Sequence, residues 1–158
     1  MINDKSKKIF IYIALVLLVF ALDRVSKVIV LNILENAGKV DIYINSFLSL
    51  YLVWNQGIGF GLFSFDQSYI YNGITLLILL INLLILYLIY KEKTPKTYFL
   101  AIILGGSCGN LFDRYYYSAV PDFIDLNYEG YHWFIFNVAD IFITLGIICL
   151  ILAEILNY

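Results

Sequence analysis

Residues 69–90 read YIYNGITLLILLINLLILYLIY, an almost unbroken run of leucine and isoleucine. A helix needs roughly 20 apolar residues to cross the hydrocarbon core of a bilayer, and this run is long enough. Three further apolar stretches occur at residues 9–30, 97–113 and 133–156. The chain is 62% hydrophobic and only 14% charged, whereas a soluble domain has about a quarter of its residues charged. The sequence therefore predicts an all-α membrane protein, with four transmembrane helices in one domain over residues 1–158.

Basic residues beside the apolar stretches predict how the chain crosses the membrane. The short link between the second and third stretches carries Lys91, Lys93 and Lys96. Because cytoplasmic loops are enriched in lysine and arginine, we expect this link in the cytoplasm. Both termini are then cytoplasmic, and residues 31–68 and 114–132 face outward. The first apolar run resembles a signal peptide, but no small-residue cleavage site follows it, so we interpret it as a retained first span.

The first outward segment has the alternating pattern of β-strands. Val40, Ile42 and Ile44 are spaced two residues apart, and the same spacing continues from Leu48 to Trp54. Period-two spacing of β-branched and aromatic residues indicates strands with one apolar face. We therefore predict a small extracytoplasmic β element at the outer membrane surface.

Polar side chains in three of the predicted helices lie at one depth. They are Asp23, Asn110, Asp113, Asn137 and Asp140. Counted at about 1.5 Å per residue, they lie roughly 20–28 Å from the cytoplasmic side of a hydrocarbon core about 30 Å thick. Placing an ionisable group at that depth costs free energy unless the group is paired with an opposite charge or is hydrated. Such a cluster therefore indicates a functional site near the outer face.

Spacing along each helix brings several of these side chains onto shared faces. Asn110, Asp113 and Arg114 are three and four residues apart, which places them on one side of a helix. Asp23 and Lys27 have the i, i+4 spacing of an ion pair. We interpret this pair as structural support for the outer end of the first span, and we assign Asp113 to the same role.

Several chemistries lack the residues they require. Residues 105–109 match G-x-S-x-G, but a nucleophile elbow needs a strand, a turn and a helix, whereas this motif lies inside an apolar helix. Its first and last glycines form G-x-x-x-G, which favours close helix packing. A single histidine, His132, leaves too few ligands for a zinc peptidase. Cys108 and Cys149 have no metal or redox spacing. We expect no cofactor, no metal and no nucleic-acid partner.

Two aspartates remain as candidates for catalysis. Asp140 lies one turn into the fourth predicted helix, and Asp122 lies in a proline-containing segment that returns toward the membrane. Two carboxyl groups held close together share a proton, so one can take a proton from water while the other donates one to a leaving amine. Asparagine side-chain amides can form hydrogen bonds with a peptide backbone, and Arg114 can bind an anionic headgroup. Alternatives are a small four-helix proton-coupled transporter and a structural assembly protein.

Five blocks of the chain resemble, in order, the lipoprotein signal peptidase (signal peptidase II) family. They are Asp23 to Lys27, Asn55 to Gly57 with Phe60 to Phe63, Gly105 to Arg114, Val120 to Asp125, and Phe136 to Asp140. The resemblance implies that Asp122 and Asp140 are the catalytic pair of a membrane aspartyl endopeptidase. It also implies a substrate site lined by Asn55, Gly57, Asn110, Arg114 and Asn137. Departures from the family pattern occur at Ile58, Gly59 and Pro121, and none removes a functional group.

The same resemblance implies a substrate and a location. Members of this family remove signal peptides from prolipoproteins, cutting just before the lipobox cysteine after it has received a diacylglyceryl group. They lie in the bacterial inner (cytoplasmic) membrane, with the active site toward its outer face. We expect a monomer surrounded by membrane lipids and sensitive to globomycin-type inhibitors.

Overall fold

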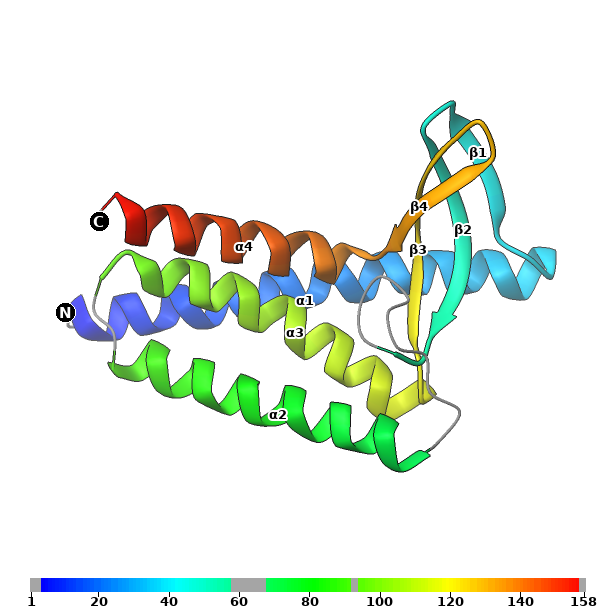
Figure 1. Cartoon of the computed structure of the whole chain (residues 1–158). Helices are drawn as coiled ribbons and strands as arrows, with labels where there is room; N and C mark the ends of the chain where they lie inside the picture. The colour runs from blue at the N-terminus through cyan, green and yellow to red at the C-terminus, as the bar shows by residue number, and fades with distance from the viewer. Residues whose placement is uncertain (1–3, 58–67, 92–93, 157–158) are drawn as a thin grey trace.

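The computed structural model describes residues 4–57, 68–91 and 94–156, which form a set of helices with a small sheet at one end (Figure 1). The helices are α1 (Asp4–Ala37), α2 (Ser68–Lys91), α3 (Lys96–Tyr117) and α4 (Val138–Ile155). The strands are β1 (Asp41–Asn45), β2 (Leu48–Asn55), β3 (Val120–Tyr128) and β4 (Tyr131–Phe136). The helices run lengthwise beside one another, and both ends of the chain lie at the end opposite the sheet.

Three of the described helices are long and apolar enough to cross a membrane. They are Ser6–Ala37 within α1, Tyr69–Lys91 within α2, and the whole of α4. Large apolar side chains on these helices are exposed, among them Leu17, Leu80 and Ile151, as expected of surfaces that face lipid. The second half of α3 is richer in glycine and polar residues. The described part of the chain is thus mostly helical, with three membrane-capable helices and a small antiparallel sheet, and the fourth span stays a prediction.

Helix boundaries differ from the prediction at several points. The helix expected over residues 133–156 begins only at Val138, because the residues before it form β4 and Asn137 caps the helix. The helices expected over residues 9–30 and 97–113 are both longer in the structure. The apolar run in the sequence continues from the strand into the helix, so the run alone does not show where β4 ends and α4 begins.

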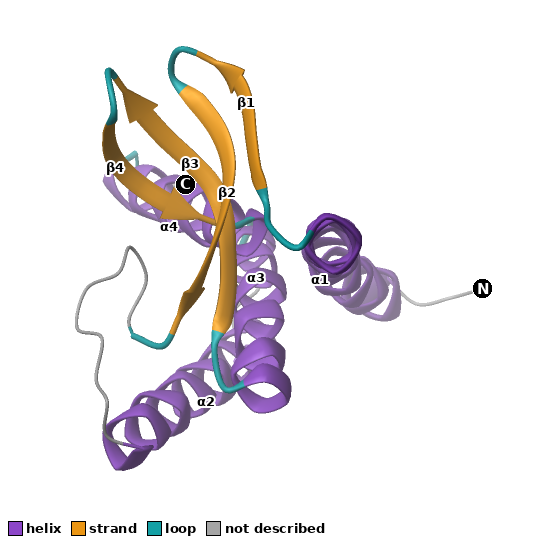
Figure 2. Ribbon diagram, turned by 90° about the vertical axis from the view of Figure 1, so that its right-hand side faces the viewer, coloured by secondary structure: helices purple, strands orange, loops and turns teal. Residues whose placement is uncertain are grey.

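The strands form one antiparallel sheet in the order β1-β2-β3-β4 (Figure 2). The predicted β element in residues 31–68 is present as β1 and β2, and two further strands, β3 and β4, were not predicted. Pairing of β2 with β3 places Val53 opposite Asp122, and Asn55 opposite Val120. The sheet therefore joins the segment that follows α1 to the segment that follows α3, beside the helix ends.

Glycines allow α3 to pack closely against its neighbours. A Cβ atom on Gly105 would lie 2.8 Å from the carbonyl oxygen of Val16 and 2.8 Å from Cβ of Val19, both in α1. A Cβ atom on Gly106 would lie 2.7 Å from the carbonyl oxygen of Ala139 in α4. A Cβ atom on Gly109 would meet the carboxylate of Asp23, so both glycines of the G-x-x-x-G motif lie against α1, in agreement with the packing interpretation.

Replacing Gly105 with alanine is expected to destabilise the protein by about 1–3 kcal/mol, because the backbone of α1 must move to admit the new methyl group. The matched control is Gly73→Ala in α2, where an added Cβ meets no atom within 4 Å. The measurement is thermal unfolding in detergent, followed by tryptophan fluorescence. Equal unfolding temperatures for the two variants would contradict a close α1–α3 contact.

Candidate active site

Asp122 is buried on β3, at the point where the sheet meets the helices. Its Oδ2 atom accepts a hydrogen bond of 2.8 Å from Nδ2 of Asn55 on β2. Its Oδ1 atom accepts one of 2.6 Å from Nδ2 of Asn137, at the start of α4. Strand pairing and the β4-to-α4 junction therefore hold this carboxyl group between two amide donors.

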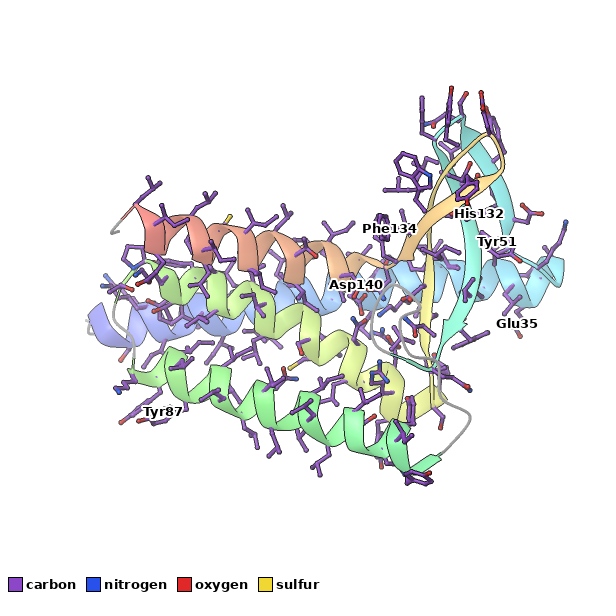
Figure 3. The ribbon with its side chains drawn as sticks, in the orientation of Figure 1. Glu35, Tyr51, Tyr87, His132, Phe134 and Asp140 are labelled. Carbon is purple, nitrogen blue, oxygen red and sulfur yellow. The ribbon has the colours of Figure 1, made fainter. Side chains whose placement is uncertain are left out.

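Asp140 lies in the first turn of α4, close to the sheet (Figure 3). Its Oδ1 atom accepts a hydrogen bond of 2.9 Å from Nδ2 of Asn110 in α3. Its Oδ2 atom accepts one of 3.1 Å from the backbone N–H of Asn137, and the Asn137 Oδ1 atom accepts one of 3.1 Å from the backbone N–H of Asp140. This reciprocal pair is a capping box, which fixes the start of the helix. One residue, Asn137, thus contacts both aspartates.

Burial and charge act together on Asp122. Removal from water, together with the nearby charge of Asp140, raises the pKa of Asp122 to about 7, although the hydrogen bonds from Asn55 and Asn137 and the charge of Lys27 oppose this rise. A carboxyl group in this state holds a proton up to neutral pH. The pair can therefore contain a protonated and an ionised member at the same time, as acid–base hydrolysis requires.

A buried cluster of four charged side chains lies beside the pair. Asp113 of α3 contacts Arg24 with an Nη1–Oδ1 distance of 2.6 Å and Lys27 with an Nζ–Oδ2 distance of 2.6 Å. Asp23 contacts the same two cations, at 2.9 Å in each case. Asp23 also accepts a hydrogen bond of 3.1 Å from the backbone N–H of Ala139 in α4. Two acids and two bases thus join α1, α3 and α4 with no net charge.

Arg114 is linked to Asn55 by two hydrogen bonds that pass through Gly57. Its Nη2 atom donates a hydrogen bond to the carbonyl oxygen of Gly57, whose own N–H donates one of 2.8 Å to Oδ1 of Asn55. The guanidinium carbon lies 5.3 Å from the ring centroid of Tyr71 in α2. The start of the segment after β2 is therefore tied to α3, and through Asn55 to Asp122. Ile58 lies outside the described residues.

The structure brings together most of the side chains that the sequence pointed to. The residues gathered around the aspartate pair are Asn55, Asn110, Asp122, Asn137 and Asp140. Lys27 and Gly57 contact this group directly, Asp23 and Asp113 are joined to it through Lys27, and Arg114 is joined to it through Gly57. Of two other residues that depart from the family pattern, one is described by the structure and one is not. Pro121 is fully buried in β3, opposite Trp54, whereas Gly59 lies outside the described residues.

The sequence interpretation missed Arg24, which contacts both acids of the charge cluster and lies 4.9 Å from the ring centroid of Phe112. Its signal was present, because an arginine directly after a long apolar run needs a partner. It also missed Tyr71, whose hydroxyl group donates a hydrogen bond of 3.1 Å to the carbonyl oxygen of Arg114. A tyrosine near a helix end carries no comparable signal.

Within residues 4–57, 68–91 and 94–156 there is no group of three or more His, Cys, Asp or Glu side chains placed to hold a metal ion. The chemistry that the geometry offers is proton transfer between water, two carboxyl groups and a leaving group.

Comparisons with known proteins agree with this chemistry. The family model described as signal peptidase (SPase) II matches residues 15–156. A lipoprotein signal peptidase of Pelagibacter ubique (strain HTCC1062) is 53% identical, over 94% of this chain and 89% of that protein. A lipoprotein signal peptidase of Anaplasma phagocytophilum (strain HZ) is 39% identical, over 94% of each chain.

The fold is also shared with a solved bacterial membrane enzyme. That structure superposes with a TM-score of 0.76 and 26% sequence identity, over 94% of this chain and 89% of the other. Similarity therefore extends over nearly the whole chain, in sequence and in fold. The chain belongs to the signal peptidase II family of aspartic-type membrane peptidases.

Proposed function

We propose that this chain removes the signal peptide from diacylglyceryl-modified prolipoproteins, cutting just before the lipidated cysteine, and that Asp122 and Asp140 carry out the hydrolysis. The observation that supports this most is the bridge through Asn137, whose side-chain amide binds Asp122 and whose backbone N–H binds Asp140. One rigid residue thereby fixes the relative positions of two acids from different elements. Family membership supplies the substrate class.

The proposed reaction uses water as the nucleophile. One carboxylate of the pair takes a proton from a water molecule while the water oxygen attacks the scissile carbonyl carbon. The C–N bond then breaks, and the protonated partner of the pair gives its proton to the leaving nitrogen. The products are a free carboxylate at the end of the signal peptide and a free amine on the lipidated cysteine.

The proposed substrate site surrounds this pair. Asn55 and Asn110 each use the amide nitrogen to bind a catalytic acid, so they hold the acids in place as well as lining the site. Gly57 and Arg114 lie at the adjoining edge, where a guanidinium group can meet peptide carbonyl groups or an anionic headgroup. These roles account for the polar residues that the sequence places on the outer half of the helices.

We further propose a single domain with four transmembrane spans in the bacterial inner membrane. Although α3 is less apolar, its 22 residues are long enough to cross a bilayer, and it packs against α1, α2 and α4. Lys91 and Lys96 lie at the end of the helices away from the sheet, where both ends of the chain also lie (Figure 1). This favours cytoplasmic termini and an active site at the outer face. A monomer embedded in lipid is sufficient for this arrangement.

The test is cleavage of a synthetic prolipoprotein by the purified protein in phospholipid. A substrate with a diacylglyceryl group on the lipobox cysteine should be cut before that cysteine, and the same peptide without the lipid should be cut far more slowly. Globomycin should block the reaction. Equal cleavage of both peptides, or cleavage indifferent to globomycin, would contradict the proposed substrate and family mechanism.

A further inference from the structure

Lys27 is the charged residue of the four-residue cluster that also contacts the active site. It is fully buried in α1, and its three N–H groups have three acceptors. Nζ lies 3.0 Å from Oδ2 of Asp23, 2.6 Å from Oδ2 of Asp113 and 2.9 Å from Oδ1 of Asn110. The contacts with Asp23 and Asp113 neutralise the charge of Lys27. The contact with Asn110 joins Lys27 to a residue that binds Asp140 of the catalytic pair.

The contact with Lys27 fixes the orientation of the Asn110 amide. An ammonium group can only donate hydrogen bonds, so the atom of Asn110 that faces it must be the oxygen. The amide nitrogen then faces Asp140, where Nδ2 donates a hydrogen bond of 2.9 Å to Oδ1. A positive charge on α1 is thereby linked, through one amide, to a carboxyl group on α4.

Hydrogen bonding alone does not distinguish the two acids. Asp122 accepts from two amide nitrogens, and Asp140 accepts from one amide nitrogen and one backbone N–H. The two acids differ in the positive charge that is linked to each of them. Asp140 lies in the first turn of α4, where the positive end of the helix dipole favours an anion, and it is the acid that is joined to Lys27. Asp122 lies on a strand, which has no such dipole.

We infer that Lys27 is a positioning residue for the peptidase reaction: acting through Asn110, it keeps Asp140 ionised and so places the shared proton on Asp122. This inference rests on the proposed function of the pair. Asp140 then takes the proton from water, and Asp122 gives its proton to the leaving nitrogen. The high pKa of Asp122, which burial and the Asp140 charge produce, agrees with this order.

Other charged groups near the pair do not provide the same link. Arg24 carries the same charge as Lys27, but its hydrogen bonds go to Asp23 and Asp113. The negative charge of Asp23 lies at the start of α4 and is offset within the cluster. Arg114 binds Gly57 on the Asn55 side of Asp122. Arg24 is therefore a matched control for Lys27, with equal charge in the same cluster.

The experiment measures the pH dependence of kcat for cleavage, in lipid, between about pH 5 and pH 9, where a pair with one proton gives a bell-shaped profile. The variants are Lys27→Met, Lys27→Arg and Arg24→Gln. Removing the Lys27 charge should move both limbs of the profile to higher pH by about one unit, the size expected of one charge several ångströms away. The Michaelis constant should change little.

Lys27→Arg should keep the limbs in place, and Arg24→Gln should lower the rate by the same factor at every pH. If Lys27→Met does not accumulate, Lys27→Gln removes the charge while keeping a donor for Asn110. Limbs that stay in place in the neutral variants, or that move as far in Arg24→Gln, would overturn the inference. Neither result touches the proposed function, which would fail instead if the enzyme cleaved normally without Asp122 or Asp140.

Discussion

Substituting asparagine for Asp122 or for Asp140 is expected to lower the rate of signal-peptide cleavage by about 10²- to 10⁴-fold, the usual contribution of one acid–base group. Asparagine preserves the size of the side chain but can neither take a proton from water nor give one to the leaving nitrogen. The hydrogen bonds that Asp122 accepts from Asn55 and Asn137 can partly persist to an amide oxygen, so the variant proteins should still fold. The measurement is the gel shift of a diacylglyceryl prolipoprotein.

Asp125→Asn is the matched control for these two variants. Asp125 is fully buried on the same strand as Asp122, three residues away, and so points to the opposite face of the sheet. Its Oδ2 atom lies 2.7 Å from Nδ1 of His132 and accepts a hydrogen bond of 2.8 Å from Asn127 (Figure 3 labels His132). This variant should retain cleavage. Full cleavage by Asp122→Asn or Asp140→Asn would remove that residue from the mechanism.

Replacing Asp113 with asparagine is expected to lower the free energy of unfolding by about 3–5 kcal/mol, the usual cost of breaking a buried ion pair from one side. The cluster contains two acids and two bases, so losing one acid leaves an uncompensated positive charge in a site shielded from water. Arg24 would lose its contact with the carboxylate in α3 at the same time. Thermal unfolding in detergent and the yield of monodisperse protein would both report this loss.

The control for Asp113→Asn is Asp41→Asn. Asp41 also forms an ion pair, with Lys39 at 3.4 Å, but both side chains are more than half exposed. Exposed pairs contribute less than about 1 kcal/mol, so the unfolding temperature should change little. If both variants unfolded at the temperature of the unsubstituted protein, the buried cluster would not be a stabilising feature.

The charge cluster also shows where sequence interpretation was incomplete. Spacing within one helix predicted an ion pair between Asp23 and Lys27, and that contact is present. The same spacing argument has no access to Asp113, which lies 86 residues further along the chain from Lys27. The isolated pair is therefore half of a larger cluster, and Arg24 completes it.

Family membership decides between the functions that the residues alone left open. A transporter and a peptidase can both place carboxylates in a membrane protein, and composition does not separate them. Asp140 nevertheless lies at the end of the helices beside the sheet, and Asp122 lies on the sheet itself, which suits a site at one side of the membrane (Figure 3). That asymmetry, with the family match over residues 15–156, favours hydrolysis over transport.

By itself the sequence determined the membrane class, the apolar helices, the first β-hairpin and the acids from which the site is built. These follow from local patterns, because hydrophobic runs, period-two alternation and i, i+4 spacing are set by neighbouring residues. Only the tertiary structure decided that Asn55 holds Asp122, that Asn137 bridges the two acids, and that Lys27 reaches Asp140 through Asn110. Strand register and helix packing set those contacts, and both depend on residues far apart in the chain.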